Sequence, residues 1–280
     1  MFKTLLVILF SYITITPQTF EFSHTIGKFN RAVSFYITAN GLICISDFGK
    51  DEIVIIDTLG NNINMFGGYG WDENSFDDPA DVFADPLTIY VADKNNHSIK
   101  RFDKNLNYVS SLYKRESENI EEQFGYPISC ATSNMGDLYF IDSENSRIMK
   151  FDIFGNYVLS FGGFDAGRFQ LDNPKQLAIN SANLIFVADG NDIVVFDQYG
   201  NGISRNSLDT TIISIRIIFD HLIACASDGI YYNYLRIPES NLTKLKIEGI
   251  DLAKIASSIL FNNKLYILSD ETIFVFNRVI

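Results

Sequence analysis

A short pattern recurs along this chain: an apolar strand that ends in aspartate, a polar turn and a second apolar strand. It is clearest in "PLTIYVADKNNHSIKRFD" at residues 86–103. Related stretches lie at 41–57, 136–152 and 183–197, with fainter ones at 222–235 and 264–277. Their aligned aspartates, 39 to 49 residues apart, are Asp47, Asp93, Asp142, Asp189, Asp228 and Asp270. Self-similarity at such a period is typical of repeat architectures, so we predict six similar structural units.

Each unit is predicted to form four short antiparallel strands. In the third unit, alternating apolar and polar residues indicate strands at 126–133, 137–142, 147–152 and 156–163. Turns rich in Asn, Gly and Asp separate these strands. Four strands in a unit of about forty residues are the content of a propeller blade. The expected fold is an all-β, six-bladed β-propeller of four-stranded antiparallel blades.

The two ends of the propeller are expected to meet in its last blade. The sixth unit has no fourth strand before the chain reaches Ile280, whereas "TFEFSHTIG" (19–27) has the pattern of an outer strand. We therefore predict that residues 20–27 supply the outermost strand of the blade formed by 252–279. Closure of this kind leaves few strand edges open to pairing with other chains.

Two long stretches resemble the NHL repeat. Phe-Gly-Gly, a polar loop, Phe and then Pro precede an aspartate-bearing hairpin in "FGGYGWDENSFDDPADV" (66–82) and in "FGGFDAGRFQLDNPKQL" (161–177). The likeness is strong over 41–200 and weaker over 201–280. It implies a six-bladed propeller, and the six repeats make residues 20–280 one domain.

Residues 1–19 have the features of a secretory signal peptide. Lys3 precedes an apolar run from Leu5 to about Ile15, which is shorter than the about 20 residues of a membrane span. An uncleaved anchor and a buried first strand are the alternatives. We expect cleavage near residues 16–20, a secreted or periplasmic protein, and no membrane insertion after cleavage.

The three cysteines, Cys44, Cys130 and Cys225, all lie in apolar strand segments. Free cysteine behaves there as a small buried hydrophobe, and an odd number of cysteines does not form a disulfide framework. We expect all three to be buried and unpaired.

The charge balance argues against nucleic acid as a partner. The chain has 22 Lys and Arg against 34 Asp and Glu, which gives a net charge of −12. Some NHL propellers bind RNA, and RNA binding needs a positive surface because phosphate contacts supply much of the affinity. The same acidity disfavours anionic membranes and favours solubility.

The repeated aspartates are interpreted as structural. A carboxylate at the end of a strand accepts hydrogen bonds from backbone N–H groups of the adjoining turn, and six equivalent copies cannot form one catalytic site. Arg147, five residues after Asp142, has the spacing at which NHL repeats brace this turn with arginine. The aspartates of the Phe-Asp endings are interpreted as turn formers too: Asp103, Asp152 and Asp197.

The residues offer few signs of catalysis. An NHL-like lyase holds zinc through three histidines, but His24, His97 and His221 are scattered over three units without zinc-ligand spacing. Lactonase-like propellers hold Ca²⁺ with Asp, Asn and Glu in the axial channel, and oxygen ligands are abundant here. We therefore expect no cofactor, with Ca²⁺ as the open possibility, and keep a Ca²⁺-dependent hydrolase or lyase as the alternative function.

A binding surface is the favoured reading. The longest loops between units, at 67–79, 113–127 and 162–174, come from three neighbouring junctions, and loops on a rigid scaffold carry function. Because aromatic residues and arginine dominate contact energy at interfaces, we select five candidate contact residues. They are Tyr69, Trp71, Arg115, Phe164 and Arg168.

Packing is the competing role for aromatic residues in these loops. We expect three of them, Phe76, Phe124 and Phe169, to pack between blades. For Trp71, the sequence favours packing and partner contact equally. The favoured function is an exported, monomeric binding module that recognises a protein, peptide or glycan.

Overall fold

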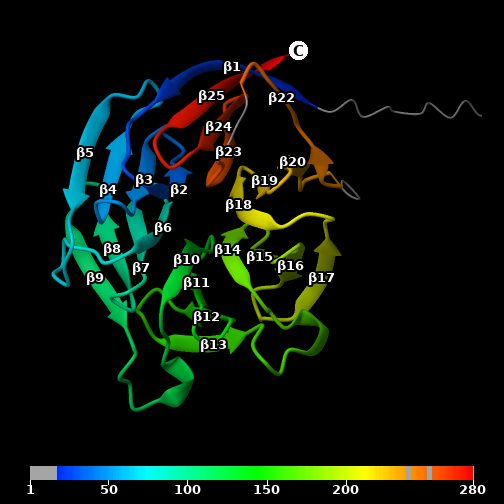
Figure 1. Ribbon diagram of the computed structural model, residues 1–280. Coiled ribbons are helices and arrows are strands. Elements are labelled where there is room, and N and C mark those ends of the chain that lie inside the picture. The colour runs from blue at the N-terminus through cyan, green and yellow to red at the C-terminus, as the bar shows by residue number, and fades with distance from the viewer. Residues whose placement is uncertain (1–17, 238–240, 251–253, 280) are drawn as a thin grey trace, which may run out of the picture.

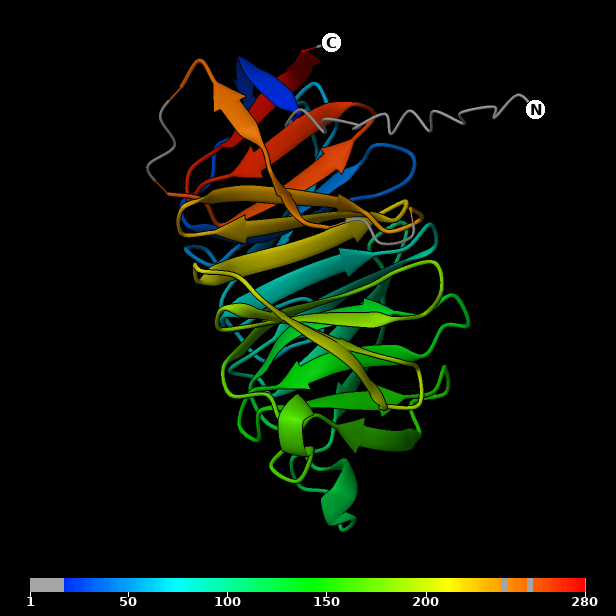
Figure 2. The same cartoon turned by 90° about the vertical axis from the view of Figure 1, so that its right-hand side faces the viewer.

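The computed structural model describes residues 18–237, 241–250 and 254–279. Within them, six sheets stand around a common axis like the blades of a propeller (Figure 1). Turned by 90°, the strands run across the ring from one face to the other (Figure 2). The predicted fold is confirmed, whereas most of the expected signal peptide, residues 1–17, lies outside the described residues.

The first four blades follow chain order from the axis outward. Blade 1 has β2 (Ala32–Ile37), β3 (Ile43–Asp47), β4 (Glu52–Ile56) and β5 (Asn62–Gly67). Blade 2 has β6 (Pro79–Ala84), β7 (Thr88–Asp93), β8 (Ser98–Asp103) and β9 (Tyr108–Tyr113). Blade 3 has β10 (Pro127–Thr132), β11 (Leu138–Asp142), β12 (Arg147–Phe151) and β13 (Tyr157–Phe161). Blade 4 has β14 (Pro174–Ile179), β15 (Ile185–Asp189), β16 (Asp192–Phe196) and β17 (Gly202–Ser207).

The last two blades depart slightly from this plan. Blade 5 has β18 (Ile212–Ile218), β19 (His221–Ala226), β20 (Gly229–Tyr234) and the short β21 (Thr243–Lys244). Blade 6 has β23 (Ser257–Phe261), β24 (Lys264–Leu268), β25 (Ile273–Val279) and β1 (Thr19–Ile26), and β22 (Lys246–Glu248) lies outside β1. Two short 3-10 segments, η1 (Ile120–Glu122) and η2 (Gly167–Phe169), interrupt the loops. No helix in the described ranges is long and apolar enough to cross a membrane.

The chain closes the ring as predicted. β1 pairs antiparallel with β25 from Thr19 opposite Val279 to Ile26 opposite Ile273. Phe20 of β1 is fully buried between blades 5 and 6. The sequence did not indicate β22, which pairs parallel with β1 and covers part of its outer edge, so the closing strand is held on both sides.

Removing β1 is expected to open the ring. A chain that starts at residue 27 loses the β25 pairing and the buried Phe20, which alone is worth about 3–5 kcal/mol on the scale of Phe→Ala core substitutions. The exposed edge of β25 then favours aggregation. The measurement is size-exclusion chromatography with a thermal melt. A chain that starts at residue 18 is the matched control, and equal monomeric melting of the two chains would contradict the role of β1.

Apolar side chains fill the spaces between neighbouring blades. Phe76 and Phe102, both fully buried, pack between blades 1 and 2 with their ring centroids 6.0 Å apart. Phe124 packs on Phe140 with ring centroids 4.6 Å apart, and the half-buried Phe169 packs against Phe196 in the next cluster. The predicted packing roles of Phe76, Phe124 and Phe169 are therefore confirmed.

The cysteines belong to this core as well. Cys44, Cys130 and Cys225 are free and at most 1% exposed, as predicted. Burial raises the pKa of the Cys44 thiol to about 12 and that of Cys225 to about 11. Buried thiols that stay protonated are poor nucleophiles.

The two faces of the ring are unlike. The start of each inner strand pairs with the end of the second strand, as Pro174 does with Asp189. The segments between blades and the hairpins between second and third strands therefore share one face, which we call the loop face. It contains the long loops 68–78, 114–126 and 162–173. On the opposite face, blades 1 to 4 have short, similar turns.

Candidate functional site

The repeated aspartates fasten the loop face to the blades. Asp47 accepts hydrogen bonds from the backbone N–H groups of Asn30 and Arg31, each at 2.8 Å. Asp93 accepts in the same way from the N–H of Asp77, also at 2.8 Å. Asp142 and Asp189 repeat the arrangement with the loops before blades 3 and 4. The structural interpretation is confirmed for these four residues.

Asp228 and Asp270 are not equivalent to the other four, which corrects the sequence alignment. Ala226 faces Ile212 in the ladder position that Asp189 occupies opposite Pro174. Asp228 comes two residues later, is partly exposed and pairs with Lys244 at 2.7 Å. Asp270 is also partly exposed and lies 3.6 Å from Lys254. Asp228 and Asp270 therefore do not form this brace with the described residues of blades 5 and 6.

A cation joins the aspartate in the three blades that follow the long loops. Arg147 donates from Nε to Asp142 at 3.0 Å and from a terminal nitrogen to the carbonyl of Gln123 at 2.6 Å. Arg205 links Asp189 to the carbonyl of Gln170 in the same way. We call these Asp–cation–carbonyl contacts the loop clamps. They confirm the bracing role predicted for Arg147.

The most buried loop clamp is in blade 2, where it was not predicted. Lys100 Nζ lies 3.0 Å from Asp93, and their side chains are 4% and 0% exposed. Lys100 also donates to the carbonyls of Asp72, at 2.7 Å, and Ser75. Burial raises the pKa of Asp93, and hydrogen bonds and the nearby ammonium oppose that rise. In blade 2 the position that corresponds to Arg147 is Ser98, opposite Asp93 in the ladder, and Lys100 lies two residues further along the strand.

Loop 68–78 is held at several further points. Asn96 donates to the carbonyl of Gly70 at 2.8 Å, and Phe76 N–H donates to the carbonyl of Gly68 at 2.9 Å. Gly67 has φ 126°, and a Cβ there would lie 2.5 Å from the carbonyl oxygen of Asp51. Glycine is therefore required where the loop leaves β5.

This fixed loop presents two aromatic side chains to solvent. Tyr69 is 67% and Trp71 is 75% exposed. Their rings make an edge-to-face contact with centroids 6.0 Å apart. Trp71 thus does not pack in the core, and its contact with a partner stays a prediction.

The other three candidate residues lie on the next two long loops. Arg115 is held by Glu144 through two contacts of 2.8 and 3.2 Å and lies over the ring of Tyr126. Phe164 is 92% exposed, and Arg168 lies over the Phe169 ring at 4.6 Å. Among the five candidates, a ring contact joins Tyr69 to Trp71 within the described residues, whereas Arg115, Phe164 and Arg168 lie on the next two loops of the same face.

A depression of about 530 Å³ lies at the centre of the loop face, where all six blades contribute to its lining. The inner strands of blades 1 to 5 each begin with a β-bulge, a feature that redirects a side chain. The residues at or beside these bulges line the depression, with Ala256 before β23 completing the ring. They are Val33, Ala80, Ile128, Lys175 and Ile213. We call this depression the axial mouth.

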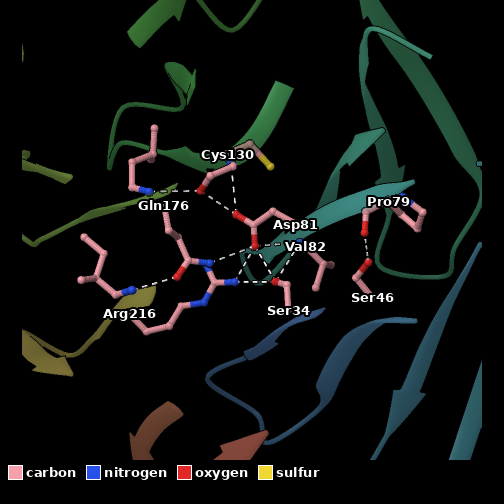
Figure 3. A network of polar contacts seen from close by, with 11 residues as sticks. Ser34, Ser46, Pro79, Asp81, Val82, Cys130, Gln176 and Arg216 are labelled. Carbon is pink, nitrogen blue, oxygen red and sulfur yellow. Dashed lines mark hydrogen bonds and ion pairs between the residues drawn. The ribbon is translucent and has the colours of Figure 1, made fainter. Parts of the chain in front are cut away.

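Below the axial mouth, a layer of polar residues fills the axis. One comes from the start of each inner strand, and each is at most 7% exposed. They are Ser34, Asp81, Ser129, Gln176, Ser214 and Ser257. Arg216 of β18 is 2% exposed and reaches across the ring to this layer (Figure 3). The axis is therefore occupied by side chains at this level.

Asp81 is the centre of this layer. One carboxylate oxygen accepts from Arg216 and Ser34, each at 2.5 Å, and the other accepts from Ser129 at 2.7 Å (Figure 3). Gln176 also donates to Asp81 at 3.3 Å. Sequence reasoning missed this network, although a polar third residue in each of the first five inner strands was a visible signal.

The described residues contain no group of three or more His, Cys, Asp or Glu side chains placed to hold a metal. His24 lies in β1, His97 in a blade 2 hairpin and His221 in β19. His97 Nδ1 accepts from the N–H of Tyr126 at 3.1 Å, and His221 contacts the hydroxyl of Tyr232 at 2.9 Å. The three histidines thus have separate surroundings.

Comparison with known sequences finds only partial similarity. No protein-family model matches the chain. It is 24% identical over 189 residues to Protein SUPPRESSOR OF QUENCHING 1, chloroplastic, of Arabidopsis thaliana, which is 56% of this chain and 18% of that protein. It is 29% identical over 141 residues to Protein brain tumor of Drosophila melanogaster, which is 49% of this chain and 13% of that protein. The matches thus span less than a fifth of either relative.

Solved structures share the fold over most of their length. A streptogramin B lyase superposes with a TM-score of 0.61 at 11% identity, covering 91% of this chain and 97% of that one. A catalytically inactive virginiamycin B lyase from Staphylococcus aureus, solved with quinupristin, superposes with a TM-score of 0.63 at 10% identity, covering 91% and 99%. At these identities the likeness establishes the propeller fold, and the chain is a six-bladed β-propeller.

Proposed function

We propose that this chain is an exported, monomeric propeller of NHL type that binds a protein partner through its loop face. The observation that carries the proposal is the exposure of Tyr69 and Trp71 on a loop held by the buried Lys100–Asp93 pair. Secretion or periplasmic export follows from the signal-like residues 1–19.

The physical reason lies in the cost of binding. An anchor on a mobile loop loses conformational freedom when it binds, whereas one on a preformed loop loses less. Large aromatic side chains supply much of the contact energy at interfaces. The loop clamps hold the bases of all three long loops, so the face is arranged before a partner arrives.

An enzyme remains the second candidate, since both solved structures above are lyases by name. A Ca²⁺-dependent hydrolase or lyase with its site in the channel needs several carboxylates that converge. Asp81 supplies the carboxylate of the buried polar layer among the described residues, and Arg216, Ser34 and Ser129 already donate to it. This geometry gives the enzyme less support than the binding module.

Trp71→Ala is expected to weaken partner binding by about 2 kcal/mol or more, as loss of an interface anchor does. Its effect on the free energy of unfolding should stay within about 0.5 kcal/mol, as for other surface substitutions. Affinity capture of the natural partner, titration of that partner against each variant and urea denaturation provide the measurements.

Phe154→Ala is the matched control, because Phe154 is 81% exposed on a turn of the opposite face. It should leave partner binding unchanged. If Phe154→Ala weakened binding while Trp71→Ala did not, the partner would use the opposite face and the loop-face proposal would be wrong.

A further inference from the structure

Three cations line the axial mouth of this acidic chain: Arg31, Lys175 and Lys254. Among the described residues that line it, the acidic one is Asp270, which lies 3.6 Å from Lys254. Arg31 and Lys175 form no ion pair with the described residues, and Arg31 lies over the ring of Phe48 at 4.5 Å. The described lining of the mouth therefore has an excess of positive charge, although the chain carries a net charge of −12.

The side chain of Lys175 differs in kind from those at the corresponding positions of the other blades. At or beside the bulges of blades 1, 2, 3 and 5 stand Val33, Ala80, Ile128 and Ile213. Lys175 is therefore the one charged residue at the bulge positions of the first five inner strands. A cation beside apolar groups fits a ligand that combines negative charge with apolar surface.

The floor of the mouth adds polar groups. Gln176 and Ser214 line it, and both are buried in the axial layer. Ser214 Oγ has no oxygen or nitrogen partner among the described residues. It lies close to the Cys225 thiol, where it opposes part of the rise in pKa that burial causes. A hydroxyl donor is therefore available beneath the cations for an oxygen of a ligand.

We propose that the axial mouth binds a carboxylate on an acidic, partly apolar peptide segment of the partner. Lys175 and Arg31 attract the carboxylate, and Val33, Ile128 and Ile213 contact its apolar neighbours. This inference deepens the proposed function, because it names the chemistry of the partner segment at the centre of the same face. It does not depend on Trp71, which lies on a loop outside the mouth.

The test uses short fluorescent peptides of alternating leucine and glutamate with an amidated C-terminus, measured by fluorescence polarisation. The matched peptide has glutamine for glutamate. A third peptide has glutamine and a free C-terminal carboxylate, which distinguishes a chain terminus from acidic side chains as the source of the charge. We expect the glutamate peptide to bind, raised salt to weaken it, and the amidated glutamine peptide not to bind.

Lys175→Met and Arg31→Met are each expected to lower the affinity for the glutamate peptide by about fivefold or more, since a charge contact is lost. Lys264→Met is the matched control, because Lys264 is an exposed cation at the start of β24, on the opposite face, and it should change affinity by less than about twofold. A circular-dichroism melt of each variant checks that it is folded.

Equal weakening by Lys264→Met would mean that only net charge matters and would overturn the proposal, as would failure of the parent to bind either carboxylate peptide. Competition by inorganic phosphate as strong as that by the peptide would replace the peptide with a small anion. If Trp71→Ala left natural partner binding intact while Lys175→Met abolished peptide binding, the outer aromatic contact would fail and the axial site would stand. The reverse result would retain the loop face and reject the axial site.

Discussion

Arg216→Met is expected to lower the free energy of unfolding by about 3–5 kcal/mol, the cost of leaving a buried charge without its partner. The side chains of Arg216 and Asp81 are 3% and 1% exposed, and a guanidinium nitrogen lies 2.5 Å from a carboxylate oxygen on the axis. Methionine retains much of the arginine side-chain volume but leaves the carboxylate of Asp81 uncompensated. Urea denaturation followed by fluorescence and by circular dichroism provides the free energies.

The double variant Asp81→Asn, Arg216→Met separates charge from packing. The oxygen of an amide at position 81 can accept a hydrogen bond from one of the buried hydroxyls of Ser34 and Ser129, and its NH2 group can donate to the other, without carrying a charge. We expect the double variant to recover more than half of the lost stability. If it were as unstable as Arg216→Met, the loss would come from packing. If Arg216→Met unfolded at the same urea concentration as the parent, the axial pair would contribute nothing to stability.

The axial pair also connects blades across the centre of the ring. Asp81 belongs to blade 2 and Arg216 to blade 5, and Ser34, Ser129 and Gln176 add contacts from three more blades. One network thus joins five blades at the level of their inner strands. Polar networks of this kind stabilise a structure when their donors and acceptors are satisfied.

The strands could be predicted because their signal is local. Alternation with a period of two is present within each short segment, so β10 to β13 lie within the four predicted ranges. The brace made by Asp47, Asp93, Asp142 and Asp189 followed from their repeated spacing. In blades 5 and 6 the alignment used the nearest aspartate in the sequence, although the equivalent position in the strand ladder is occupied by another residue. In blade 5 that residue is Ala226, which faces Ile212.

The site could be predicted only in part because its contacts are remote in the chain. Arg216 and Asp81 are 135 residues apart, and no local pattern pairs them. Lys100 was overlooked because the clamp position was sought only where the NHL pattern has arginine. The exposure of Trp71 depends on the hydrogen bonds that shape loop 68–78. The sequence Gly-Gly-Tyr-Gly before Trp71 is compatible with both a buried and an exposed side chain.

Lys100→Met is expected to cost about 3–5 kcal/mol of unfolding free energy, because it leaves the fully buried Asp93 without its cation. The carbonyls of Asp72 and Ser75 lose their donor at the same time. The loop should then open more often than the rest of the blade. Hydrogen exchange at the amides of Gly70 and Phe76, which bond across the loop, measures that opening beside urea denaturation.

Lys94→Met is the matched control within the same blade. Lys94 forms a 2.6 Å pair with Asp78, but its side chain is 35% exposed, so its loss should cost no more than about 1 kcal/mol. If the two lysine variants unfolded alike and loop exchange were unchanged, Lys100 would not hold the loop. If Lys100→Met instead loosened the loop and weakened partner binding while Trp71 was intact, the aromatic pair would depend on the clamp beneath it, since a mobile anchor pays an ordering cost that a fixed one avoids.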